Sequence, residues 1–302
     1  MKLFPRQLVC VSLKLLRTEV SILIIFCIYG ERVLAPFDMA LLSSAAFLVG
    51  IIAAMTGVGG GVFIVPFLSL AYDFSSHQAI GTSLATIIFT SISSAIGYWR
   101  QRRIDYKVGS ILTLTTIPGA FVGAYLTSFI EEKLLGLIFG VFLIFVALHM
   151  AFQFNIYRIQ IPRIGKIWHR KIVDSGGVIL EYDANVNLGL VLSFFGGLSS
   201  GLLGIGGGAF MVPILHLTMS FPMHVTVATS MFIMVFTSIS GAATHFSLGN
   251  VRIYHAVFIC IGVIFGALLG AYFSKKISGK GLRRMFGVVL FLVSMRMILK
   301  YL

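Results

Sequence analysis

Long apolar stretches alternate along the chain with short polar connections. Two of these stretches, residues 39–72 and 187–219, are each interrupted by three consecutive glycines. The others are long enough to cross a bilayer as single helices, which takes about 20 residues, and lie at 19–37, 77–99, 107–128, 133–152, 224–246, 254–274 and 281–302. The pattern predicts an all-α polytopic membrane protein with an extra N-terminal helix.

The first apolar stretch is the weakest, because Glu31 and Arg32 lie inside it. The basic residues before it also suit a signal peptide. We find no convincing cleavage site of small residues and favour an uncleaved helix.

The two interrupted stretches carry the same motif. GVGGGVFIVP begins at Gly57 and GIGGGAFMVP at Gly204, an offset of 147 residues (204 − 57). The same offset relates His77 to His224, Thr82 to Thr229, Ser83 to Ser230, Gly119 to Gly266, and Gly123 to Gly270. We interpret this register as a duplicated unit. The predicted organisation is a basic segment with a weak transmembrane helix (1–38), repeat 1 (39–152), a linker (153–186) and repeat 2 (187–302).

Composition supports the membrane assignment. Hydrophobic residues make up 58% of the chain and charged residues 11%, and the mean hydropathy is +1.00. Soluble domains are about a quarter charged. The net charge of +13 lies in the short connections, which argues against nucleic-acid binding. The cysteines, Cys10, Cys27 and Cys260, show no metal-binding spacing, so we expect neither a metal nor a cofactor.

Basic clusters orient the predicted helices. They fall at 100–107, 158–171 and 275–284, and the positive-inside rule places all three, with the N-terminus, in the cytoplasm. If each glycine-broken stretch enters and returns, each repeat has three full spans, the repeats are inverted and the clusters share one side. If each broken stretch crosses fully, the repeats are parallel and the last cluster lies outside. We favour the inverted arrangement.

The linker is the one sizeable polar stretch. Its segment HRKIVDSGGVILEYD has a Ser-Gly-Gly turn between β-prone flanks, so a small β-hairpin is an alternative to an irregular cytoplasmic connector, which we favour.

The glycine triplets, Gly59-Gly60-Gly61 and Gly206-Gly207-Gly208, let the backbone leave helical geometry inside the membrane. We expect a short helix to restart at Val62 and to end near Leu70. Its free N–H groups and positive dipole end suit an anion, and interrupted helices in two halves point to a transporter's substrate site. No Lys or Arg lies in 39–99 or 187–251, so backbone, hydroxyl, amide or histidine groups would hold the anion.

Each of these motifs also has a purely structural interpretation. The glycines could serve close helix packing. The hydroxyls proposed for the substrate, Thr82, Ser83, Thr229 and Ser230, could link helices instead. His77 and His224 could carry protons or cap their helices. The faces GAFVGAY and GALLGAY, which contain Gly119/Gly123 and Gly266/Gly270, are better explained by packing.

The two motifs, together with HQAIGTS from His77 to Ser83, resemble the sulfite exporter TauE/SafE family of permeases. The resemblance spans about residues 40–302. It implies an inner-membrane transporter of small, often sulfur-containing anions. The second half departs from the motif, because Ala228 stands where the first has Gly81.

We therefore expect an inner-membrane secondary transporter for a small oxyanion or organosulfonate, working by alternating access and coupled to protons or to the membrane potential. A permease for another organic anion and a non-transporting scaffold or assembly factor are the alternatives. A membrane enzyme is disfavoured, since the sequence has no HExxH motif and no carboxylate pair inside the spans. Export and uptake, and any oligomeric state, are compatible with the sequence.

Overall fold

The computed structural model describes residues 36–152, 167–274 and 280–302. Residues 41–302 form one compact unit. The predicted N-terminal helix, its signal-peptide alternative and part of the linker lie outside the described residues. The helices of the first half are α2 (Pro36–Thr56), α3 (Gly61–Ala71), α4 (Ser76–Arg100), α5 (Tyr106–Leu126), the 3-10 turn η1 (Thr127–Phe129) and α6 (Glu132–Phe152). The second half contains α7 (Val186–Leu203), α8 (Gly208–Pro213), the π-helical turn η2 (Ile214–Thr218), α9 (Met223–Ser247), α10 (Ile253–Phe273) and α11 (Lys280–Tyr301).

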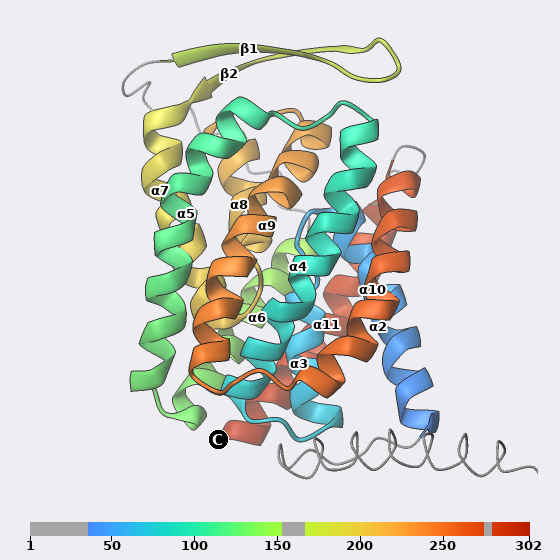
Figure 1. The fold of residues 1–302 in the computed structure, drawn as a ribbon, viewed down its shortest axis with the longest axis vertical. Coiled ribbons are helices and arrows are strands. Elements are labelled where there is room, and N and C mark those ends of the chain that lie inside the picture. Colours follow the sequence, from blue (N-terminus) through green and yellow to red (C-terminus); the bar gives the residue numbers. More distant parts are fainter. Residues whose placement is uncertain (1–35, 153–166, 275–279) are drawn as a thin grey trace, which may run out of the picture. The chain divides into compact units, whose positions relative to one another are not determined.

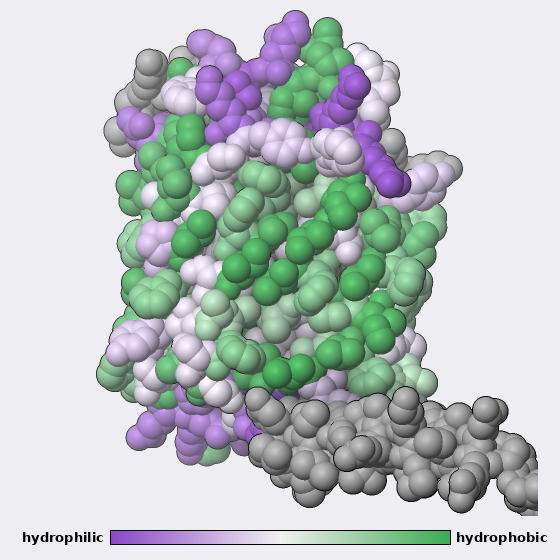
Figure 2. Space-filling view, viewed as in Figure 1, coloured by the Kyte–Doolittle hydropathy of each residue, from purple (hydrophilic) through white to green (hydrophobic). Residues whose placement is uncertain are grey.

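The predicted all-α membrane fold is confirmed. Within the described residues, 6 helices are long and apolar enough to span a bilayer: Asp38–Thr56, Ser76–Arg100, Tyr106–Phe129, Val186–Leu203, Met223–Ser247 and Ile253–Phe273. On the face shown in Figure 2, hydrophobic side chains form a band between two polar ends. Such a band matches the hydrocarbon layer of a membrane.

The two glycine-broken stretches each form an interrupted pair of helices. α3 begins at Gly61, one residue before the predicted restart, and its counterpart Gly208–Thr218 begins 147 residues later (208 − 61). The bounds of α4 and α9, and of α5 and α10, differ by the same 147 residues (223 − 76 and 253 − 106). α2 begins at Pro36, before the predicted boundary at residue 39; proline is favoured at the first position of a helix.

The chain enters the two interrupted pairs from opposite ends (Figure 1). We call the end with the α5–α6 connection the Glu131 end, and the opposite one the β-hairpin end. α3 returns to the Glu131 end, where Ser69 contacts Tyr301. η2 returns to the β-hairpin end, where Leu215 and Met219 join a core cluster with Tyr182.

The linker forms a β-hairpin at the β-hairpin end. A hairpin was the less favoured of the two predictions for this segment. β1 (Ile167–Val173) pairs antiparallel with β2 (Ile179–Asn185). The turn is closed by Asp174, whose carboxylate accepts the N–H groups of Gly176 and Val178. The Ser175 N–H donates to the Gln101 carbonyl, so the hairpin is bound to the α4–α5 connection.

Glycine faces bring two helix pairs into close contact, as predicted. A Cβ on Gly119 or Gly123 would collide with the α7 backbone at Phe194 and Leu198. A Cβ on Gly266 or Gly270 would collide with α2 at Phe47 and Ile51. These glycines are packing residues of α5 and α10.

Candidate functional site

The two glycine loops, residues 57–60 and 204–207, have the same backbone conformation. In the first, φ is +78° at Gly57, +89° at Gly59 and +90° at Gly60. In the second, φ is +69° at Gly204, +74° at Gly206 and +83° at Gly207. Side chains rarely adopt such angles, which explains the choice of glycine.

Each loop leaves a run of backbone amides without partners. Gly57 still donates to Ala53, and helical bonding resumes with Phe63 and Ile64, which both donate to Gly60. Between them, the N–H groups of residues 58–62 donate to no other described residue, nor do those of 205–209 in the second loop. Most of these residues are buried. Successive free N–H groups at a helix start form a concave donor site for an anion.

The loops contact each other across the two halves. A Cβ on Gly61 would collide with the Gly204 carbonyl, and a Cβ on Gly208 would collide with the Gly57 carbonyl. Ile87 of α4 and Met234 of α9, which are fully buried, pack against both loops. The two triplets predicted to form half-sites are therefore brought together and covered by apolar side chains.

The predicted hydroxyls bind backbone groups of the opposite half, and two of the four do so at the glycine loops. The Ser83 hydroxyl donates to the Gly204 carbonyl at 2.9 Å. The Ser230 hydroxyl shares its proton between the Gly57 carbonyl at 3.2 Å and the Val227 carbonyl of its own helix at 2.9 Å. Thr82 accepts from the Arg252 N–H and Thr229 from the Asp105 N–H, both at 3.0 Å. All four hydroxyl residues have no exposed surface. In this conformation they link the two halves, and a direct role in binding stays a prediction.

Two further bonds hold the helix ends before the loops. The Tyr98 hydroxyl donates to the Ala54 carbonyl at 2.7 Å. The His245 Nε2 lies 3.0 Å from the Gly201 carbonyl. Since a carbonyl only accepts, Nε2 carries the proton. No motif in the sequence links this histidine to the loops.

His77 and His224 are not brought together. His77 is half-buried at the start of α4, and its Nε2 contacts the Thr127 carbonyl at the Glu131 end at 3.0 Å. His224 is exposed at the start of α9, near Arg103 and Asp174 of the β-hairpin end. Both positions agree with the interpretation of histidines near the membrane surface, and a proton-carrying role stays a prediction.

A buried ion pair closes the β-hairpin end. The Asp105 carboxylate accepts two hydrogen bonds from Arg170, at 2.8 and 2.9 Å, and one from the Tyr182 hydroxyl at 2.6 Å. Burial alone would raise the pKa of Asp105, but these hydrogen bonds and the Arg170 charge outweigh it and lower the pKa below its usual value. Because the Asp105 N–H donates to the Thr229 hydroxyl, Asp105 joins the β-hairpin to α9.

Sequence reasoning missed Arg296, which lies in α11 beside two cavities. An ionisable residue inside an apolar span is by default a functional candidate, so the sequence already contained the signal. Among the described residues, no cluster of three or more His, Cys, Asp or Glu side chains could hold a metal ion.

The fold is that of a multi-pass membrane protein of the transporter class. It combines helices long enough to span a bilayer with two interrupted helix pairs, whose glycine loops meet. The family described as "Sulfite exporter TauE/SafE" matches residues 42–297. The chain belongs to this family and is a membrane transporter.

Curated relatives have the same general description. The chain is 35% identical over 256 residues to the probable membrane transporter protein YunE of Bacillus subtilis, covering 82% of this chain and 93% of the relative. It is 29% identical to a probable membrane transporter protein of Methanocaldococcus jannaschii, covering 86% and 96%. It is 30% identical to YdhB of Bacillus subtilis, covering 76% and 87%. No solved structure matches the chain.

Proposed function

We propose that the chain is a secondary permease for small anions, namely sulfur-containing oxyanions or organosulfonates, held at the two glycine loops. The observation that carries the proposal is the matched pair of loops, each with a run of buried backbone N–H groups that have no partner among the described residues. Unpaired buried N–H groups are costly, so a site that retains them in both halves favours a ligand that accepts hydrogen bonds.

The charge around the loops supports a singly charged substrate. Two helix N-termini together supply about one positive charge, and residues 39–99 and 187–251 contain no Lys or Arg. A monoanion is matched by this field, whereas the second charge of a dianion would lose its water without compensation.

We further propose that two inverted repeats work by alternating access. The support is the reciprocity of the contacts: Ser83 binds Gly204 of the other half and Ser230 binds Gly57. Such matched contacts allow one half to rock against the other while the loops stay at the centre. His77 and His224, one at each end, would exchange protons with the two sides if transport is proton-coupled.

In this proposal the protein lies in the plasma membrane with the β-hairpin end in the cytoplasm. Arg102, Arg103, Lys107, Arg170 and Lys171 all belong to the segments gathered at this end. The positive-inside rule then gives the orientation, with the central linker cytoplasmic.

The test is flux of sulfite, sulfoacetate, taurine and sulfate in proteoliposomes, with and without a pH gradient. We expect uptake of sulfite or an organosulfonate that exceeds uptake in protein-free vesicles. Ligand-dependent thermal shifts in detergent provide a second readout. Transport of unrelated organic anions alone would favour the alternative permease, and a protein that responds to none of the anions would favour a scaffold.

A further inference from the structure

Two neighbouring cavities lie between α3 and α11. The inner one, of about 420 Å³, is lined mainly by apolar residues of α2, α3, α10 and α11. The outer one, of about 720 Å³, includes Asp73 and Lys300 at the Glu131 end. Leu70, Val293 and Arg296 line both, so these residues form the wall where the cavities meet.

The inner cavity adjoins the first glycine loop. Val49 and Ile64 line it, and they lie 3.2 and 3.6 Å from the position that a Cβ on Gly60 would take. The pair of cavities therefore extends from the exposed Asp73 to the side chains that cover Gly60.

Arg296 is the unpaired cation in this space. Lys300, its neighbour on α11, is paired with Asp73 at 3.2 Å and also donates to the Ser69 carbonyl. The Arg296 guanidinium forms no ion pair or hydrogen bond with another residue of the described ranges. Arg296 is exposed at the wall that the two cavities share, so its guanidinium is accessible to a ligand. Ionisable residues inside the spans of membrane transporters commonly mark substrate pathways.

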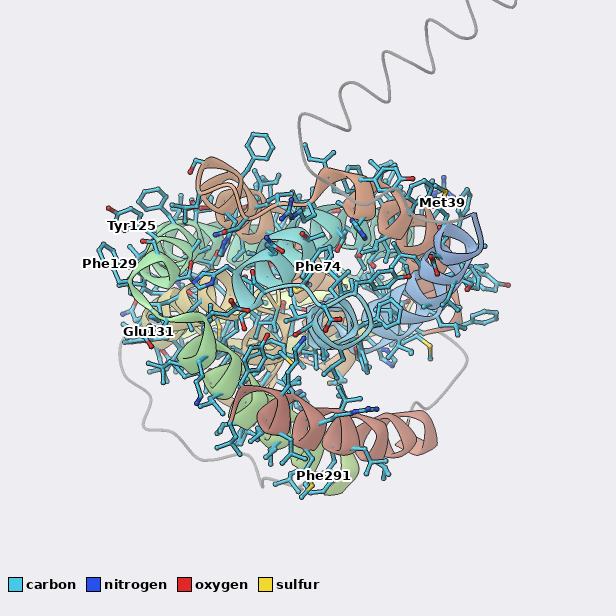
Figure 3. The ribbon with its side chains drawn as sticks, turned by 90° about the horizontal axis from the view of Figure 1, so that it is seen from below. Met39, Phe74, Tyr125, Phe129, Glu131 and Phe291 are labelled. Atoms are coloured by element: carbon cyan, nitrogen blue, oxygen red, sulfur yellow. The ribbon has the colours of Figure 1, made fainter. Side chains whose placement is uncertain are left out.

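The corresponding space in the second half is filled differently. Phe210, the counterpart of Phe63, stacks on Phe142 of α6 with ring centroids 5.2 Å apart. Phe63 lines the inner cavity. Seen from the Glu131 end, α11 packs with α6 at one edge, and Phe291 points away from α3 (Figure 3).

We propose that the two cavities form a vestibule in which Arg296 binds the anionic group of an organosulfonate on its way to the first glycine loop. The planar guanidinium presents paired N–H donors to two oxygens of one anionic group. The apolar walls of the inner cavity accommodate the carbon chain of the ligand. This inference rests on the proposed transport of anions, narrows the substrate to organosulfonates and adds the route.

A cysteine in the wall tests the vestibule without measuring transport. Val293→Cys is made in a chain whose native cysteines are replaced, and its reaction with a neutral thiol reagent is followed with and without butanesulfonate. We expect butanesulfonate to slow labelling at least about fivefold when Arg296 is present, and to have no effect after Arg296→Gln. Met295→Cys, on an exposed position of the same helix outside both cavities, is the control and should label equally with and without the sulfonate.

Transport gives the second readout. Arg296→Gln should raise the KM for butanesulfonate about tenfold or more, Arg296→Lys should raise it less, and Lys133→Gln, which removes an exposed cation of the same end, should leave it unchanged. An unchanged KM in Arg296→Gln, or labelling of the Val293→Cys variant that butanesulfonate does not slow, would overturn the vestibule while transport by the parent protein stands.

The proposed function can also fail separately. If the parent protein moves no anion, but butanesulfonate protects the Val293→Cys thiol through Arg296, the vestibule is retained as a binding site and transport is refuted. If that thiol reacts only after lipid is removed, with or without sulfonate, the cavities belong to a membrane lipid and the organosulfonate route is overturned.

Discussion

The Ser83 hydroxyl donates to the Gly204 carbonyl at 2.9 Å across 121 positions of sequence. The equivalent bond of the other half runs from the Ser230 hydroxyl to the Gly57 carbonyl. Each glycine loop is thus bound by one hydroxyl from a helix of the opposite half. The loops, which have few helical bonds of their own, depend on these contacts for their position.

Removing either hydroxyl should reduce stability. Ser83→Ala or Ser230→Ala should each cost about 1 kcal/mol, because a buried carbonyl loses its donor. Thermal unfolding in detergent measures this, and Ser199→Ala, which removes an exposed hydroxyl bonded within its own helix, is the control. Loss of ligand binding with unchanged stability would contradict the structural role and indicate direct contact with the substrate.

The glycine conformation should be needed for transport. Gly60→Val and Gly207→Val should abolish flux while the protein still inserts and folds, since both positions have positive φ and lie at the proposed donor sites. Gly249→Val is the matched control, because φ is +73° there but nothing lies within 4 Å of the added Cβ. Normal flux in both loop variants would make the glycines spectators.

Much of this arrangement was predictable from the sequence, for identifiable reasons. Hydrophobic length indicated the spans, and the glycine triplets indicated the two breaks and the restart to within one residue at Gly61. The partners of Thr82 and Ser83 were not predictable, because both are backbone groups far along the chain. Backbone partners leave no pattern of residue types.

Two other features were predicted less well, for different reasons. The β-hairpin was the less favoured interpretation of the linker, and the Asp105–Arg170 pair that attaches it joins residues 65 positions apart. A charge pair of that separation has no local signal. Arg296 is visible in the sequence as a cation inside the last apolar span, but it lies far along the chain from both glycine motifs, and its counterpart at the repeat offset is His149 (296 − 149 = 147).

The ion pair under the β-hairpin should matter more than a surface pair next to it. Arg170→Ala should destabilise the protein by about 3 kcal/mol, because the Asp105 carboxylate stays buried without its cation. Lys171→Ala breaks an exposed pair with Glu181 and should cost at most about 0.5 kcal/mol. Equal unfolding temperatures for the two variants would argue against a stabilising role of the Asp105–Arg170 pair.

The Asp105–Arg170 pair also predicts that the stability of the protein depends on pH. The pKa of Asp105 is lower in the folded state than its usual value of about 3.9. Its contribution to stability is therefore complete above that usual value and is lost as pH falls through the lower, folded pKa. Thermal unfolding from pH 7 down to pH 3 should show a steeper loss for the parent than for Asp105→Asn. Parallel curves would exclude this carboxylate as the source.

Orientation can be measured with an impermeant thiol reagent in a chain whose native cysteines are replaced. Cysteines at Arg102 and Lys171, on the β-hairpin end, should react only after the membrane is opened, whereas a cysteine at Glu131 should react from outside. The reason is the concentration of basic residues at the β-hairpin end. External labelling at 102 and 171 with protection at 131 would reverse the proposed orientation.

Charge should decide which anions bind at the loops. With about one positive charge from two helix N-termini, the site should bind a small monoanionic sulfonate at least about tenfold more tightly than sulfate at neutral pH. Affinity for sulfite should rise as pH falls, because its singly charged form accumulates. Affinity for a sulfonate that stays monoanionic should change little. His77 and His224 lie at opposite ends and their rings interact with groups outside the loops, so replacing both with glutamine should leave these affinities within about twofold. If the histidines carry protons, the double variant should instead lose accumulation driven by a pH gradient while exchange of anions continues. Calorimetry and counterflow in proteoliposomes separate the two effects, and equal affinity for sulfate and the sulfonate would point to a cationic group at the loops themselves.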